Sequence, residues 1–192
     1  MNMKLRPTIF LLPALLCGAA TIEAQKFDYR LLATTKTSTM EKELNQAAEA
    51  GFVFSGAMGG ESSMGGKEVI VVMTKDIGAP AAAKRYKLLA TSKTSTMQKE
   101  LQRGGDEGFV YCGQTVFEST FGGREVAVIL ERDVEAKAKR IEYKLLATSR
   151  TSTMEKELRE MGGVGYKFLG VVVGQTAFGG KEVISILQKS EK

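Results

Sequence analysis

The chain has 192 residues, of which 43% are hydrophobic and 26% are charged, and this balance excludes a wholly disordered protein. The net charge of +5 is small, and both signs alternate along the chain, so we expect no nucleic-acid partner. The sequence contains no histidine, the side chain that most often serves as a general base or a metal ligand near neutral pH.

The first 24 residues have the pattern of a signal peptide. Lys4 and Arg6 precede an apolar run at 9–17, and small residues follow it. We expect cleavage after Ala24, with Ala20 as the alternative, and therefore an exported protein, either periplasmic or secreted. The apolar run is too short for a stable transmembrane span, although an uncleaved N-terminal anchor is the competing interpretation.

Cleavage at this site would leave one thiol, Cys112, which excludes an internal disulfide in the exported chain. An alternative fate of Cys17 is lipidation, although the residues before it are larger than lipidation sites prefer. The neighbours of Cys112, Val110 and Tyr111, predict a strand and a buried thiol, the alternative being a thiol available for dimerisation.

Three copies of one sequence unit follow the leader. Tyr29, Tyr86 and Tyr143 open these copies at a constant offset of 57 residues, and the copies align without a gap. We therefore divide the chain into a signal peptide, 1–24, and three repeats, 25–80, 81–137 and 138–192.

The middle copy illustrates the predicted elements in chain order. Tyr86–Thr91 is apolar and compatible with a strand. Ser95 is followed by Gln98 three residues later, the pattern of a capping box, so Ser95 is predicted to cap a short helix. The helix is expected to end near Gly108, because a glycine suits the left-handed position after a helix. The corresponding residues of the other copies are Ser38, Glu41 and Gly51, and Ser152, Glu155 and Gly165.

A hairpin is predicted to complete each copy. The second strand is expected at 52–56, 109–113 and 166–170, and glycine pairs at 65–66, 122–123 and 179–180 suit a tight turn. The last strand, at 69–73, 126–130 and 183–187, is apolar at nearly every position, which is typical of a central strand. We therefore predict an α+β fold of three βαββ units, each with strand order first, third, second and one helix on one face.

The units are expected to depend on one another. A unit of this size buries too little surface alone, and a helix on one face leaves a second apolar sheet face uncovered. We therefore expect the units to pack through those open faces. The linkers at 77–85 and 134–142 are short enough to keep neighbours adjacent, and the composition of the second is compatible with a helix.

Each copy has the same order of features: Tyr-x-Leu-Leu, a short helix, a Gly-aromatic step, a further Gly and a hairpin. In this order each copy resembles a family of small bacterial βαββ domains of unknown function. Their Gly-Trp-Glu-Leu step corresponds here to Gly51-Phe52-Val53-Phe54, Gly108-Phe109-Val110-Tyr111 and Gly165-Tyr166-Lys167-Phe168, without the Trp and Glu. The resemblance implies the βαββ fold and carries no assigned activity.

Motifs for common chemistries are incomplete. Gly-Gly-Lys at 65–67 lacks the first glycine and the Ser/Thr of a phosphate loop, because Glu61 and Glu68 stand there. Cys112 has no histidine partner, and the recurrent carboxylates occur singly, so we expect no catalytic residue, cofactor or metal.

The best polar candidate is the loop at the start of the middle helix: Lys93, Thr94, Ser95 and Thr96. Hydroxyls, free N–H groups and a positive charge meet there, which suits a small anion. Plain capping is the competing interpretation. The favoured function is a noncatalytic binding or assembly module of the cell envelope, whose partner is unknown and could be an envelope protein. The alternative is a small-anion receptor or an enzyme with a pocket between repeats.

Overall fold

The computed structural model describes residues 25–61, 67–118, 124–175 and 180–190. The first unit consists of β1 (Phe27–Thr34), α1 (Thr37–Glu49), β2 (Val53–Glu61) and β3 (Lys67–Asp76). The second consists of β4 (Lys84–Thr91), α2 (Thr94–Asp106), β5 (Val110–Glu118) and β6 (Arg124–Asp133). The third consists of β7 (Ile141–Thr148), α3 (Thr151–Gly163), β8 (Lys167–Gln175) and β9 (Lys181–Ser190). The predicted α+β fold of three βαββ units is confirmed.

Each unit forms its own three-stranded sheet, and all the strand pairs are antiparallel. The orders are β1-β3-β2, β4-β6-β5 and β7-β9-β8, so the third strand of every unit is central, as its apolar sequence predicts. The hairpin strands are longer than the sequence pattern indicated. The glycine pairs at 65–66 and 122–123, and Gly179, lie outside the described residues.

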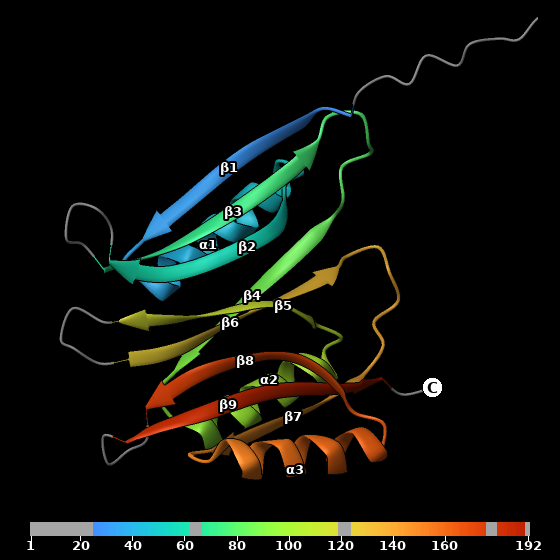
Figure 1. The fold of residues 1–192 in the computed structure, drawn as a ribbon. Helices are drawn as coiled ribbons and strands as arrows, with labels where there is room; N and C mark the ends of the chain where they lie inside the picture. Colours follow the sequence, from blue (N-terminus) through green and yellow to red (C-terminus); the bar gives the residue numbers. More distant parts are fainter. Residues whose placement is uncertain (1–24, 62–66, 119–123, 176–179, 191–192) are drawn as a thin grey trace, which may run out of the picture.

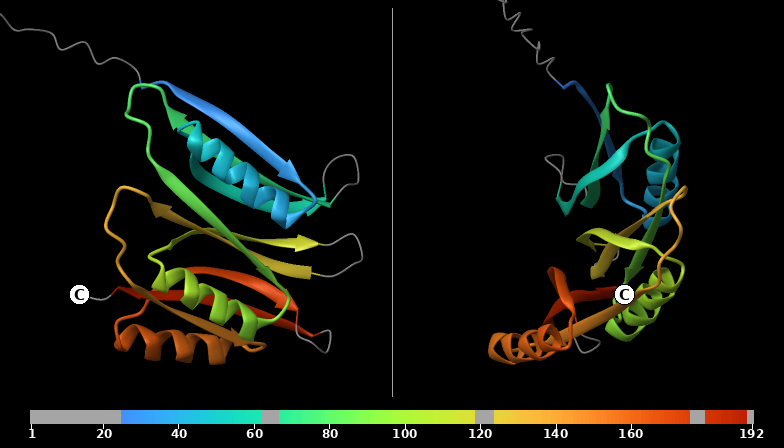
Figure 2. Two further views of the ribbon diagram at one scale, coloured as in Figure 1. Left: turned by 180° about the vertical axis from the view of Figure 1, so that it is seen from behind. Right: turned by 90° about the vertical axis from the view of Figure 1, so that its right-hand side faces the viewer.

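The units stack in chain order, with the sheet of the first unit at one end and α3 at the other (Figure 1). Seen from behind, α1 lies in front of the first sheet, and β4 crosses beneath it (Figure 2). The open face of the second sheet is covered by the first unit, because Tyr86 and Ile129 of that face belong to the first unit's core. The third sheet is covered by the second unit in the same way, since Tyr143 and Ile186 belong to the second core.

The helix ends follow the predicted glycines, but the helix starts do not follow the predicted serines. Gly51, Gly108 and Gly165 have φ of 86°, 79° and 93°, a conformation that favours glycine. The N-cap positions, however, are Lys36, Lys93 and Arg150, and none of these three makes a side-chain cap hydrogen bond within the described residues.

The predicted serine caps are therefore wrong. Thr91 explains the earlier start of α2, because its hydroxyl accepts a hydrogen bond from the backbone N–H of Lys93 at 3.1 Å and turns the chain. Lys93 stays extended, and the helix begins at the next residue. Ser95 consequently lies inside the first turn, and the same arrangement occurs in the other two units.

The linker before β7 is also not helical. Residues 134–140 form bends and extended chain, and Ala138 lies against Gly108, where the chain passes over the end of α2. Its helix-forming composition is overridden by this contact and by the short distance that the linker has to span.

Candidate assembly surfaces

The contact between the first two units is a helix laid along the free edge of a strand. Asn45 of α1 accepts from the backbone N–H of Tyr86 at 3.0 Å and donates to the carbonyl of the same residue at 3.0 Å. One turn earlier, the Glu41 carboxylate accepts from the N–H of Leu88 at 2.9 Å. The two side chains satisfy the edge of β4 as a neighbouring strand would, so this edge is not open to further pairing.

The second and third units repeat this contact with amides. Gln98 of α2 accepts from the N–H of Leu145 at 2.7 Å and donates to the carbonyl of Tyr143 at 2.9 Å. Gln102 accepts from the N–H of Tyr143 at 3.0 Å and donates to the carbonyl of Ile141 at 3.2 Å. Gln98 was predicted to reach back to its own helix start, but its amide belongs instead to the contact with the third unit.

A tyrosine anchors each contact. Tyr86 and Tyr143 are only 1% and 2% exposed. The Tyr86 hydroxyl accepts from the N–H of Phe54 at 2.8 Å, and the Tyr143 hydroxyl accepts from the N–H of Tyr111 at 2.7 Å. Burial raises the pKa of both phenols, so each stays protonated. Each tyrosine therefore fastens one unit to the backbone of the unit before it.

Glycines make room for the approach. A Cβ at Gly105 would lie 2.2 Å from the carbonyl oxygen of Ile141 and 2.9 Å from the Tyr143 ring, so α2 lies closer to β7 than a side chain at this position would allow. The aromatic residue of each second strand also covers a glycine of the next unit. A Cβ at Gly113 would lie 2.6 Å from the Phe54 ring, and one at Gly170 would lie 2.5 Å from the Tyr111 hydroxyl.

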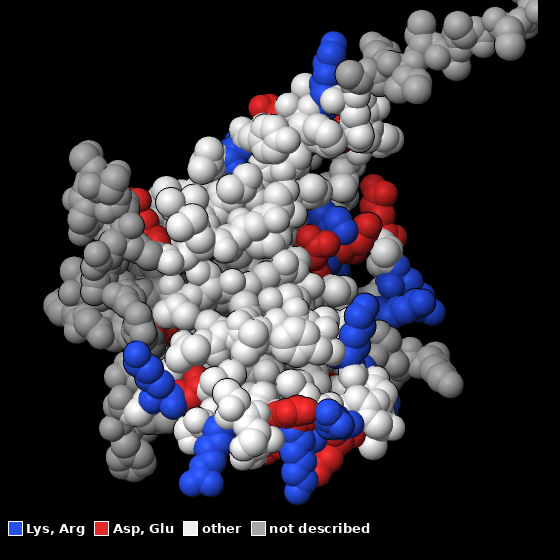
Figure 3. Space-filling view, viewed as in Figure 1, with Lys and Arg blue, Asp and Glu red and all other residues white. Residues whose placement is uncertain are grey.

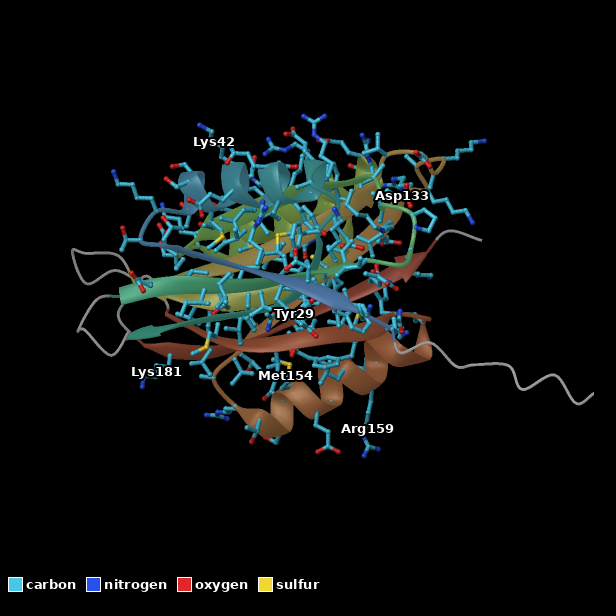
Figure 4. The ribbon with its side chains drawn as sticks, turned by 90° about the horizontal axis from the view of Figure 1, so that it is seen from above. Tyr29, Lys42, Asp133, Met154, Arg159 and Lys181 are labelled. Carbon is cyan, nitrogen blue, oxygen red and sulfur yellow. The ribbon has the colours of Figure 1, made fainter. Side chains whose placement is uncertain are left out.

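The first unit presents one half of this contact to solvent. Tyr29, the counterpart of Tyr86, is 62% exposed, and its neighbour Leu31 is 69% exposed. A Cβ at Gly56, the counterpart of Gly113, would meet no described atom within 4 Å. Together with exposed Met58, these residues form what we call the head face. Figure 4 shows Tyr29 on this face and Lys42 of α1 pointing away from it.

The head face belongs to a side of the molecule that carries few charges. In Figure 3, the surface over the first sheet is almost free of charged side chains, which gather toward the margins and around α3. The same sheet face is buried in the other two units, where it carries Ile129 and Ile186. The first sheet therefore exposes the face that the second and third sheets bury against the units before them.

The third unit presents the other half of the unit contact to solvent. A Cβ at Gly162, the counterpart of Gly105, would meet no described atom within 4 Å, and Phe168, the counterpart of Phe54, is 47% exposed. Glu155 and Arg159 stand where α2 has its two glutamines, and they pair with each other at 2.8 Å. These four residues form what we call the tail face. Figure 4 shows Arg159 pointing outward from α3.

The residues predicted to bind an anion lie at the start of α2. Lys93 is the N-cap residue of α2, and Thr94, Ser95 and Thr96 form its first three helical positions. A cleft of about 480 Å³ adjoins the equivalent residues of the first unit, Thr37 and Ser38. The cleft is lined by both signs of charge: Lys87, Arg103, Glu41 and Glu100. The anion site stays a prediction.

The described residues give little support for other chemistry. The half-buried thiol of Cys112 donates to the carbonyl of Ile129 at 3.3 Å, and burial raises its pKa, so it is a poor nucleophile at neutral pH. Among the described residues, no group of three or more acidic, cysteine or histidine side chains is placed to hold a metal ion. In the same part of the chain, no helix is both long and apolar enough to span a membrane.

Comparison of the chain with protein-family models, with curated proteins and with solved structures gave no match. The resemblance to small bacterial βαββ domains therefore stays a prediction.

Sequence reasoning missed the polar residues of the unit contacts. The sequence shows only that a Glu or Gln is followed one turn later by Asn45 in the first helix and by Gln102 in the second, and this spacing does not identify what the side chains bind. The three helices differ at these two positions, because α1 has Glu41 in the first and α3 has Arg159 in the second.

Proposed function

We propose that this protein is an exported, noncatalytic assembly module of the cell envelope, acting in the periplasm or after secretion. The observation that carries the proposal is the exposure of the head face and the tail face at opposite ends of the stack. Each is one half of a contact that occurs twice inside the chain. Apolar residues are not kept exposed as a contiguous group in most monomeric proteins, and such groups mark sites of association.

A small-anion receptor is the weaker candidate. The cleft beside Thr37 and Ser38 combines hydroxyls with two cations, which favours an anion. Two carboxylates line the same cleft, and Lys87 is already paired with Glu107. These carboxylates would repel an incoming anion, so we favour assembly.

The proposal is tested on the chain produced with its own leader in a bacterial host. We expect the protein in the envelope or the medium, lacking residues 1–24, and in complexes larger than the 20.8 kDa of the full 192-residue chain by native electrophoresis of gentle extracts. A Tyr29→Asp variant should lose these complexes. Lys42→Ala, which changes an exposed side chain on the other side of the first unit, should keep them.

Two results would contradict the proposal. One is an uncleaved chain confined to the cytosol. The other is a monomeric protein in every extract in which the Tyr29→Asp variant behaves like the parent.

A further inference from the structure

We propose that the partner of the head face is the tail face of a second copy of this chain, so that copies join head to tail. The inference rests on the proposed assembly function and names its partner. It follows from the internal contacts, because units one and two, and units two and three, show what covers each kind of face. A third contact of the same kind needs only the third unit of one copy and the first unit of another.

The tyrosine of the head face fits the open space on the tail face. In the chain, the Tyr143 ring lies against Gly105 of the preceding helix. Tyr29 of one copy would occupy the equivalent place beside Gly162 of another, where a Cβ meets no described atom within 4 Å. Its hydroxyl would reach the backbone N–H of Phe168, as the Tyr143 hydroxyl reaches that of Tyr111.

A second aromatic contact is also available, in which an aromatic residue of the tail face covers a glycine of the head face. Phe54 covers Gly113, and Tyr111 covers Gly170. Phe168, which is exposed in the third unit, covers no such glycine in the described part of the chain. Gly56 of a second copy is the uncovered glycine that corresponds to Gly113 and Gly170, so the tail face would cover the head face at this point as well.

The polar pair differs from the internal contacts, but its charges are complementary. Glu155 can accept from the N–H of Leu31, as Glu41 accepts from that of Leu88. Arg159 has no acceptor atom, so it cannot serve the N–H of Tyr29 as Asn45 serves that of Tyr86. In the first unit this N–H is already satisfied by the Asp28 carboxylate at 2.9 Å. Asp28 therefore lies at the strand edge where Arg159 would arrive, and the two carry opposite charges.

The core of the third unit is incomplete without a neighbour. Its buried cluster contains only Leu146, Met154 and Leu187 among the described residues. Leu158, which corresponds to the fully buried Leu44 and Leu101, is only partly buried. Covering α3 and β8 with the sheet of a second copy would bury Leu158 further, and apolar burial is the main driving force for such association.

The contact uses two different faces, so each copy keeps one face free after it binds. Head-to-tail contacts of this kind produce a closed ring when the rotation between copies closes, and a filament when it does not. Both products support the proposal, and a symmetric dimer through two head faces contradicts it.

The test uses the purified chain and two variants. Tyr29→Asp disables the head face, and Phe168→Asp disables the tail face; Leu31→Asp and Gly162→Trp replace them if either fails to fold. All four positions are exposed, and circular dichroism with thermal melting verifies each fold. The mass is measured by light scattering after gel filtration over a wide concentration range, on each variant alone and on their equimolar mixture.

We expect the mass of the unaltered chain to rise with concentration beyond that of a dimer. Each variant alone should stay monomeric, because one face is missing. The mixture should form a dimer, twice the monomer mass, and nothing larger, because only one complementary pair of faces remains. This rescue by mixing requires two different faces, which a symmetric contact cannot provide.

Two results would overturn the inference. If the purified chain is monomeric at every concentration, the tail face does not bind the head face of another copy. If envelope complexes that are sensitive to Tyr29→Asp nevertheless persist, the assembly function stands with a different partner. Loss of association in the head variant, with full association in the tail variant, shows a contact between two head faces.

Discussion

The two glycines Gly105 and Gly162 occupy the same position of α2 and α3, and they should respond to alanine with opposite signs. Replacing a helical glycine by alanine stabilises a helix by about 0.5–1 kcal/mol when space is available. The space differs. A Cβ at Gly105 would lie 2.2 Å from the carbonyl oxygen of Ile141, whereas one at Gly162 meets no described atom within 4 Å.

Gly105→Ala therefore has to push β7 away from α2. The added Cβ would clash with a backbone oxygen held in a sheet and would lie 2.9 Å from the Tyr143 ring. Neither group can move away as easily as the end of a flexible side chain. Overpacking of this kind costs about 1–3 kcal/mol, which exceeds the gain in helix propensity. We expect Gly105→Ala to lower the free energy of unfolding by about 1–2 kcal/mol, and Gly162→Ala to raise it by about 0.5–1 kcal/mol.

Urea unfolding followed by circular dichroism measures both changes at one protein concentration, chosen low enough for the chain to be monomeric. The same position of α1 is Ala48, which is buried, so the first unit accommodates a Cβ there and the expected cost is specific to the close approach of α2 to β7. If both variants are stabilised equally, α2 does not lie on β7 as closely as described, and the account of the unit contact is wrong.

Three further predictions concern the same contacts. Tyr86→Phe should lower the free energy of unfolding by about 1–2 kcal/mol, because a buried N–H loses its acceptor, whereas Tyr29→Phe should change it by less than about 0.5 kcal/mol; equal effects in urea unfolding would contradict the anchor role. Gln98→Leu should cost about 2–3 kcal/mol, because it leaves a strand N–H and a carbonyl unpaired, and a parent-like unfolding midpoint would refute this bond. Ser95→Ala should change stability by less than about 0.5 kcal/mol in thermal melts, since the serine is not the N-cap residue. A loss of about 1 kcal/mol would instead support capping by Ser95.

Much of the fold could be predicted because the information is local and repeated. The change from a β-compatible run to a helix stripe and back occurs in each copy, and the uniformly apolar last strand identifies the centre of each sheet. The glycines after the helices were equally informative, since the positive φ at Gly108 follows from a purely local requirement.

The functional surfaces could not be predicted because they depend on residues from two units. Ser95 followed by Gln98 has the same appearance whether the amide returns to its own helix or reaches a strand some 45 residues further on. The choice is decided by β7 lying alongside α2, which no local pattern encodes. Gly105 was similarly ambiguous, since a glycine weakens a helix in isolation but here allows β7 to lie close to α2. The proposed anion site at Lys93 has the same limitation, because a binding site needs groups from more than one loop.

The unequal cores of the three units have a consequence for the order in which the stack opens. In a stack where each unit touches only its neighbours, stability is set by each unit and its contacts, so opening starts where both are weakest. The third unit has one neighbour and the small cluster around Met154, so its backbone amides should exchange with deuterium before those of the central strand β6. A copy docked against α3 would give the third unit a second neighbour. Slower exchange in α3 at high protein concentration would thus report the joining of copies from within the molecule, without any measurement of size.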